Sequence, residues 1–249
     1  MRRDGRQVDE IRSCTFERDY TEMALGSVLV SMGKTRVLCT VSLDERVPPW
    51  LRGTGKGWIT AEYSLLPGSS PERVSREAVK GKQSGRTQEI QRLIGRSIRA
   101  IVDLNALGEK QLIVDCDVLQ ADGGTRTASI CGAYVALADA VSRMEQAYRV
   151  GPNVLLASCA AVSVGIVDGG SLLDLDYSED ARAEVDMNVV MTSDGHYVEV
   201  QGTAENSPYT KRQLDDMLSL AEHGIAEILE IQSKTLTTVA SPKPELFRS

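Results

Sequence analysis

The short segment Asp122–Thr127 places two glycines and an arginine between an expected strand and an expected helix. Free backbone N–H groups at the start of a helix attract anions, and glycine lets an anion approach the backbone closely. Arg126 adds a planar guanidinium that suits a phosphate group. The Walker pattern GxxxxGK[ST] is absent from this segment. Gly124, Thr125 and Arg126 therefore form either a phosphate site of another kind or a simple glycine turn.

A second arginine, Arg86, follows Ser84-Gly85 and precedes another expected helix. Ser84 or Thr87 is suited to cap this helix through its hydroxyl group. A cation near the positive end of the helix dipole is slightly unfavourable unless an anion binds there. Arg86 is thus either a second phosphate ligand or a solvated surface arginine.

Carboxylates are concentrated in the segment 178–188. From Ala183 onward polar and apolar residues alternate, which predicts a strand with Glu184, Asp186 and Asn188 on one face. Asp180 precedes this strand and can fold back onto the polar face. Clustered carboxylates bind Mg²⁺, which prefers a few oxygen ligands together with water and substrate phosphate. The alternative is an ordinary solvated strand face.

Basic residues gather in the stretch 72–99, which carries eight Lys or Arg and three Glu, in a chain whose net charge is −7. Residues 67–85 are polar and rich in Gly, Ser and Pro, which predicts a long exposed loop. Loops of this length usually have a function. Arg73 and Arg76 lie in this loop, and their charge predicts contact with a phosphate backbone.

The overall composition excludes several classes of protein. Apolar residues make up 42% and charged residues 25%, as in a globular protein, while 4% aromatic residues argue against RNA binding by base stacking. Two histidines argue against a His-rich zinc site. Five cysteines without a CxxC pair predict buried thiols in a reduced, cytoplasmic protein. We expect no membrane association, because no apolar run reaches spanning length and the amino terminus lacks a signal-peptide core.

The order of the expected elements predicts an α+β fold of two similar βαβ-type halves packed together. In the first half we expect strands at 26–32, 35–43, 58–66 and 112–119 and helices at 87–103 and 127–143. In the second half we expect strands at 154–167, 171–175, 183–192 and 197–204 and a helix at 210–231. The predicted division is an N-terminal half at 1–150, a C-terminal half at 151–238 and a frayed tail at 239–249.

Three long segments closely resemble the ribonuclease PH family: Ser84–Ala100, Asp115–Ile130 and Asp174–Thr192. The opening RRDGR and the stretches 57–63 and 200–205 are similar to it as well. The resemblance covers roughly residues 2–238. One position departs from the family, because Gly68 stands where an arginine usually follows Leu-Pro. This departure weakens the tRNA contacts that the resemblance implies for this loop, but not the phosphate-dependent chemistry that it implies.

The resemblance implies a phosphate-dependent 3′→5′ exoribonuclease that trims tRNA precursors and other RNA 3′ ends, releases nucleoside diphosphates, and runs backwards as a nucleotidyltransferase. It implies Mg²⁺ as the divalent cation and a ring-shaped homohexamer built as a trimer of dimers. The rival interpretations are an exosome-like or non-catalytic ring subunit that binds RNA, a related phosphorylase of mRNA decay and, more distantly, a small-molecule kinase. Non-catalytic ring subunits tend to lose arginine or aspartate sites that this chain retains.

The resemblance also assigns roles to individual residues. It implies that inorganic phosphate binds at Arg86, Gly124, Thr125 and Arg126. It implies that Asp180 and Asp186 are the catalytic, metal-associated pair. Family arginines that contact tRNA match Arg73 and Arg76.

Overall fold

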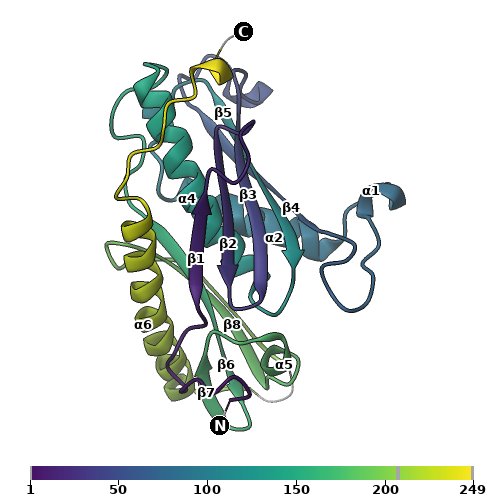
Figure 1. Ribbon diagram of the computed structural model, residues 1–249. Helices are drawn as coiled ribbons and strands as arrows, with labels where there is room; N and C mark the ends of the chain where they lie inside the picture. Colours follow the sequence, from purple (N-terminus) through teal and green to yellow (C-terminus); the bar gives the residue numbers. More distant parts are fainter. Residues whose placement is uncertain (1, 206–207, 248–249) are drawn as a thin grey trace.

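The computed structural model describes residues 2–205 and 208–247 and contains two β-sheets with helices packed against them (Figure 1). The first sheet has the strand order β1-β2-β3-β5-β4, with β1 (Cys14–Arg18), β2 (Gly26–Met32), β3 (Thr35–Asp44), β4 (Trp58–Leu65) and β5 (Gln111–Gln120). The second has the order β7-β6-β8-β9, with β6 (Cys159–Val167), β7 (Gly170–Leu173), β8 (Val185–Thr192) and β9 (Tyr197–Ala204). The expected α+β fold is confirmed.

The first sheet combines a hairpin with a parallel crossover. β2 and β3 pair antiparallel around the two-residue turn Gly33-Lys34, as the sequence predicts. Of the strand pairs in the described residues, only β4 and β5 run parallel, and the connection between them includes α2 (Gly85–Arg99). Because a parallel pair needs a long crossover, this connection has room for α1 (Glu77–Lys80) and α3 (Leu104–Leu107) as well.

The long helix α4 (Thr125–Gln146) joins the two halves, because it packs against β2 and β3 of the first sheet and against β6 of the second. The packing against the first sheet is close: a Cβ atom added at Gly132 would lie 2.7 Å from both Cys39 Sγ and Val30 Cγ1. A larger residue at this position would push the helix away from the sheet. α4 therefore has a fixed position, and so does its first turn.

The second sheet is covered by α6 (Lys211–Thr235), which packs against β6 and β7 (Figure 1). Thr210 starts this helix with a capping box, in which its side chain and that of Gln213 each bond the other's backbone N–H group. The apolar spacing that predicts α6 is borne out by its buried Met217, Ala221 and Ile225. Within the described ranges, no helix is both long and apolar enough to cross a bilayer.

The structure differs from the predicted elements mainly where segments are short or isolated. β1, α1, α3 and α5 (Tyr177–Asp180) were not expected, and the three helices have four residues each, too few to show a 3.6-residue periodicity. β6 begins at Cys159 rather than at residue 154, and α2 ends at Arg99 rather than at 103. Ser241 contacts the first half, where its carbonyl accepts a hydrogen bond from Arg143 Nε at 2.8 Å. The division of the chain at residue 150 stays a prediction.

Candidate active site

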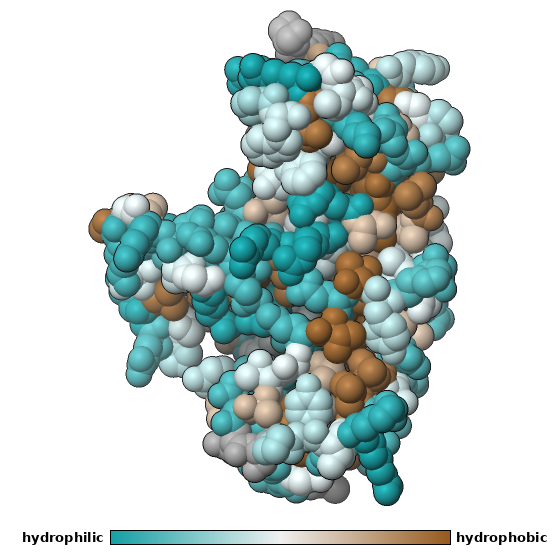
Figure 2. All heavy atoms as spheres, turned by 180° about the vertical axis from the view of Figure 1, so that it is seen from behind, coloured by the Kyte–Doolittle hydropathy of each residue, from teal (hydrophilic) through white to brown (hydrophobic). Residues whose placement is uncertain are grey.

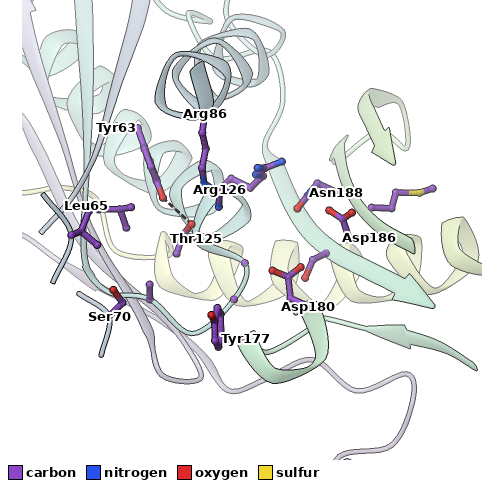
Figure 3. Close-up of a pocket in the computed structure, with 16 residues that line it drawn as sticks. Tyr63, Leu65, Ser70, Arg86, Thr125, Arg126, Tyr177, Asp180, Asp186 and Asn188 are labelled. Atoms are coloured by element: carbon purple, nitrogen blue, oxygen red, sulfur yellow. Dashed lines mark hydrogen bonds between the residues drawn. The ribbon is translucent and has the colours of Figure 1, made fainter. Parts of the chain in front are cut away.

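A pocket with a volume of about 200 Å³ lies among the start of α4, the start of α2, α5 and β8 (Figure 3). Six of the residues expected to bind phosphate or metal line it: Arg86, Gly124, Thr125, Arg126, Asp180 and Asp186. They come from four separate elements and span about a hundred residues of sequence. The fold therefore brings the two predicted groups, arginines with a helix start and paired carboxylates, into one pocket.

The glycine segment before α4 has the backbone conformation that only glycine adopts readily. Gly123 and Gly124 have φ angles of 74° and 63°. Thr35 Oγ1 holds the segment in place, because it donates to the Gly123 carbonyl at 2.7 Å and accepts from Asp122 N at 2.9 Å. In the described structure α4 has no side-chain cap and no acidic residue in its first turn. Its first N–H groups and the helix dipole are therefore suited to an anion.

Arg126 is oriented by two residues from distant parts of the chain. Its Nη1 donates to Gln201 Oε1 at 2.9 Å, and its Nη2 lies 3.6 Å from Glu89 Oε2. Gln201 in turn donates to Glu89 at 3.0 Å. The Arg126 side chain is only 15% exposed. Such a held guanidinium is preorganised for a bidentate contact with phosphate.

Arg86 occupies the first turn of α2 and is exposed at the pocket. The start of the helix is stabilised by Ser84, whose hydroxyl accepts from Thr87 N at 3.2 Å. Thr87 Oγ1 also donates to Glu77 Oε1 at 2.9 Å. In Figure 3 the side chains of Arg86 and Arg126 lie on the same side of the pocket, opposite Asp180. Their two charges favour an anion between them.

The carboxylates belong to the second half of the chain. Asp180 is the last residue of α5, a single turn closed by a capping box between Asp176 and Glu179. Asp186 lies on β8, where it is paired with Gly165 of β6 and Thr203 of β9. No group of three or more potential metal ligands was found among the described residues. Two carboxylates still meet the requirement of Mg²⁺, which usually takes one or two together with water and substrate phosphate.

The environment of Asp180 is suited to a cation. Partial burial and the nearby charge of Asp186 raise the pKa of Asp180, while Arg86 and Arg126 oppose the rise. The residue keeps an exposed face, so its carboxylate is partly rather than fully desolvated. A cation bound beside both aspartates would relieve the repulsion between them.

Several lining residues were not found from the sequence. Tyr63 shares a 2.8 Å hydrogen bond with Thr125 Oγ1, shown dashed in Figure 3, and burial raises the pKa of its phenol. Tyr177 is exposed at the pocket, and Ser163 Oγ accepts from Leu175 N at 3.1 Å. Local sequence carries no signal for Tyr63 or Ser163, because only long-range packing brings them here. Asn188 lines the pocket too, as its alternation with Asp186 on the strand suggested.

Residues 67–85 form a projecting arm that contains α1, and Figure 2 shows it from behind as a largely hydrophilic surface. Arg73 and Arg76 are exposed on this arm, and in the described structure their side chains make no ion pair or hydrogen bond. Arg76 lines a second pocket of about 480 Å³, which shares Tyr63, Leu65 and Val74 with the first. Arg73 lines neither pocket. The arm thus extends the site outward from the arginines.

The arginines farther along α2 have other partners. Arg96 makes a bidentate contact with Glu199, with distances of 2.7 to 3.0 Å. Arg99 lies over the Trp58 ring at 4.5 Å and donates to the Ile59 carbonyl at 2.8 Å. The positive charge of this region is therefore concentrated on the arm and on the first turns of α2, rather than along the whole segment 72–99.

Two family models match this chain: domain 1 of the 3′ exoribonuclease family, RNase PH, at residues 10–142 and domain 2 at residues 158–224. The chain belongs to the RNase PH family. A ribonuclease PH of Corynebacterium kroppenstedtii is 54% identical over 237 residues, which cover 95% of this chain and 93% of that protein. The resemblance inferred from the sequence is therefore confirmed.

Solved structures share the RNase PH fold with this chain. The crystal structure of rice (Oryza sativa) Rrp46 matches with a TM-score of 0.76 at 17% identity, covering 95% of this chain and all of that one. The Archaeoglobus fulgidus exosome with RNA bound to the active site matches with a TM-score of 0.77 at 24% identity, covering 92% of this chain and 91% of that one. At these identities the likeness concerns the fold.

Proposed function

We propose that the pocket is the active site of a phosphate-dependent 3′→5′ exoribonuclease that trims the 3′ ends of tRNA precursors and releases nucleoside diphosphates. One observation carries the assignment of the site: two arginines and a helix start face a pair of aspartates across one pocket. An anion site beside a cation site is what phosphoryl transfer between phosphate and RNA needs. The 54% sequence identity to a ribonuclease PH supports the same activity.

Inorganic phosphate would be held by Arg86, by Arg126 and by the N–H groups at Gly124 and Thr125. One of its oxygens attacks the last internucleotide phosphorus in line and forms a new P–O–P bond. The bond from that phosphorus to the 3′ oxygen of the preceding nucleotide breaks, and this oxygen takes up a proton. The products are a nucleoside diphosphate and an RNA shorter by one nucleotide. The reverse reaction adds a nucleotide from a diphosphate.

The protein contributes mainly by positioning the reactants and neutralising charge. Holding phosphate next to the RNA end turns a bimolecular encounter into an oriented reaction, and this can supply about 7–11 kcal/mol of the barrier. Asp180 and Asp186 would hold Mg²⁺, and the partial burial and mutual repulsion of their carboxylates suit a cation. When bound, the ion supplies positive charge at the reacting phosphates.

The arm at residues 67–85 would bind the body of the RNA. Arg73 and Arg76 are exposed there, outside the first pocket. Phosphate contacts of this kind add affinity but carry little sequence information. Gly68 has no atom within 4 Å of an added Cβ, so the contact of the usual family arginine is missing without any steric reason.

The chain would assemble as a homohexamer, a trimer of dimers. Its RNase PH family and its likeness to subunits of exosome assemblies support this arrangement. Light scattering on the purified protein is expected to give six times the mass of the 27.1 kDa chain. A monomer at working concentration would contradict the assembly but not the chemistry of the pocket.

The activity is tested by incubating a tRNA precursor with the enzyme with and without inorganic phosphate and separating the released nucleotides. We expect nucleoside diphosphates with phosphate and no shortening without it. Equal release of monophosphates in both reactions would identify a hydrolase. Binding of RNA without release of nucleotides would favour the alternative, a non-catalytic ring subunit. An Asp186→Asn preparation controls for a contaminating nuclease.

A further inference from the structure

One buried arginine, Arg12, does not line the pocket but connects its two walls. The phosphate wall is the glycine segment with the start of α4, and the aspartate wall is α5 with Asp186. Arg12 Nε and Nη2 donate to Asp174 Oδ2 and Oδ1 at 3.0 and 2.6 Å, and Arg12 N donates to Oδ2 at 2.8 Å. Its Nη1 donates to the Asp122 carbonyl at 2.6 Å and lies 3.5 Å from that of Gly123. The same guanidinium thus contacts the glycine segment before α4 and the residue that leads into α5.

The connection is buried and strongly charged. The side chains of Arg12 and Asp174 are each 4% exposed. Burial by itself would raise the pKa of Asp174, but the charge and the hydrogen bonds of Arg12 hold that pKa below its ordinary value. A buried pair of this kind is costly to break, because the remaining charge has no partner. Because the pKa of Asp174 is lowered, its carboxylate is ionised and paired with Arg12 at neutral pH.

The two walls also touch directly at this point. A Cβ atom added at Gly123 would lie 2.6 Å from the Leu175 carbonyl oxygen and 2.8 Å from Tyr177 N. The backbone before α4 therefore rests on the backbone that enters α5. A small sliding movement here would change the distance between Arg126 and Asp180. Arg12 bonds the glycine segment at the Asp122 backbone carbonyl and bonds the side-chain carboxylate of Asp174, which precedes α5.

Each wall has an anchor of its own besides Arg12. Thr35 holds the glycine segment through the Asp122 and Gly123 backbone. Arg2 holds α5, because its Nε and Nη2 donate to Glu179 at 2.8 and 2.7 Å. Because each wall keeps its own anchor, we expect loss of the Arg12 connection to act mainly on the spacing between the walls.

We propose that Arg12 is a positioning residue that sets the distance between the phosphate wall and the aspartate wall of the pocket. The proposal rests on the roles assigned above to Arg126, Asp180 and Asp186. Each wall binds its own ligand, but phosphorolysis needs the phosphate and the RNA end at the correct separation. A misplacement of about 1 Å can cost on the order of 100-fold in rate. The expected signature of losing Arg12 is reduced turnover with nearly unchanged binding.

The test uses Arg12→Lys, which keeps a positive charge beside Asp174 but replaces the planar guanidinium, whose separate nitrogens bond Asp174 and the Asp122 carbonyl, with a single ammonium group. We expect kcat to fall about 10–100-fold, while the KM for phosphate stays close to that of the wild type. Phosphate binding measured by calorimetry without divalent metal should also be unchanged. Asp174→Asn breaks the same connection from the other side. If Arg12→Lys folds poorly, Asp174→Asn should still show the lowered kcat with an unchanged KM for phosphate.

Arg18→Lys is the matched control, because Arg18 is also a largely buried arginine that binds one aspartate, Asp139, through two nitrogens at 2.9 and 2.6 Å. It should lose thermal stability but keep its kcat per folded molecule. The proposal is overturned if Arg12→Lys and Asp174→Asn lose kcat only in proportion to the fraction unfolded, or if phosphate KM rises with the loss. Arg126→Ala tests the proposed phosphate site separately from the role of Arg12. If this variant kept wild-type phosphate kinetics, Arg126 would not belong to the phosphate site.

Discussion

Arg126 in the pocket and the two arginines of the arm are held in opposite ways, while Arg86 is exposed at the pocket. Arg126 in the pocket is mostly buried and is oriented by Gln201 and Glu89. Arg73 and Arg76 on the arm are exposed, and the described structure gives their side chains no partner. A group that must stabilise a developing charge gains from being held in advance, because no reorganisation is then needed during the reaction. A group that only attracts a polyanion needs no fixed geometry.

This comparison predicts two separable kinds of variant. Changes in the pocket should alter turnover or the use of phosphate and leave RNA affinity nearly unchanged. Changes on the arm should alter RNA affinity and its salt dependence and leave the chemistry of short substrates unchanged.

The largest effect is expected for Asp186→Asn. A neutral amide does not replace a carboxylate that holds Mg²⁺, and several kcal/mol of charge stabilisation corresponds to roughly 100- to 1000-fold in turnover. RNA binding should remain close to that of the wild type, because the arm is separate. Single-turnover kinetics and a filter-binding assay measure the two quantities.

Glu184→Gln is the control for this change, because Glu184 lies two residues before Asp186, just ahead of β8, and accepts a hydrogen bond from Gly169 N rather than lining the pocket. It should keep wild-type turnover. Substantial activity in Asp186→Asn would remove Asp186 from the metal site.

The next effect is expected for Arg126→Ala. A hydrogen bond to a charged group contributes about 1.5–3 kcal/mol, so kcat/KM for phosphate should fall roughly 10- to 200-fold. Because Arg126 also pairs with Glu89, the unfolding temperature should be followed in parallel. Arg96→Ala, which breaks an exposed pair with Glu199 outside the pocket, should leave phosphate kinetics unchanged.

A smaller effect is expected for the arm. Arg73→Ala combined with Arg76→Ala should weaken tRNA-precursor binding on the order of tenfold and flatten the salt slope by about one unit per lost contact. Cleavage of a very short oligonucleotide should barely change. Affinity measured as a function of salt decides the question. An unchanged slope would mean that the arm does not carry RNA.

Two further variants sharpen this test. Lys211→Ala with Arg212→Ala removes two exposed charges from the start of α6 and should affect the slope less than the arm variant does. Gly68→Arg should tighten tRNA binding, because the space around Gly68 is open. If the two double variants weaken binding equally, the arm has no special role.

The smallest effect concerns pH. The pKa of Asp180 is raised in the folded protein. Its carboxyl group therefore keeps its proton at a pH where an ordinary aspartate, with a pKa of 3.8, has lost it. Its contribution to the free energy of unfolding therefore falls as pH rises through that window and stays lower above it. We expect Asp180→Asn without metal to be at least as stable as the wild type at neutral pH.

Mg²⁺ should make the wild type more stable than Asp180→Asn, since an ion that binds only the folded state stabilises the wild type and not the variant. The Mg²⁺ concentration that gives half activity should also rise as pH is lowered toward the raised pKa. Asp194→Asn is the control, because hydrogen bonds from Thr192 and His196 lower the pKa of Asp194. The Asp194 carboxylate therefore stabilises the folded protein at neutral pH, and its loss should lower the stability. Thermal unfolding across pH measures both, and a wild type unaffected by Mg²⁺ would contradict the metal assignment.

The sequence by itself determined the main elements and the chemical groups. Apolar spacing at Ile90, Leu93 and Ile94 defined α2, and alternation through Asp186 defined β8, because both periodicities are properties of neighbouring residues. The types and spacing of the residues around Arg86 and Arg126 made an anion site one of two interpretations, beside a glycine turn and a solvated arginine. Longer motifs indicated the RNase PH family, which the family models confirm.

Only the tertiary structure decided how these groups meet. Arg86 and Asp186 are a hundred positions apart in the sequence but line the same pocket, because α2 packs against α4, and α4 packs against β6, the strand that pairs with β8. The orientation of Arg126 by Gln201 and Glu89 and the connection made by Arg12 depend on such long-range contacts as well. α5 has four residues and is held by a capping box and by Arg2, so periodicity could not predict it. Local patterns encode elements, whereas the spacing between elements is set by packing and buried charge pairs.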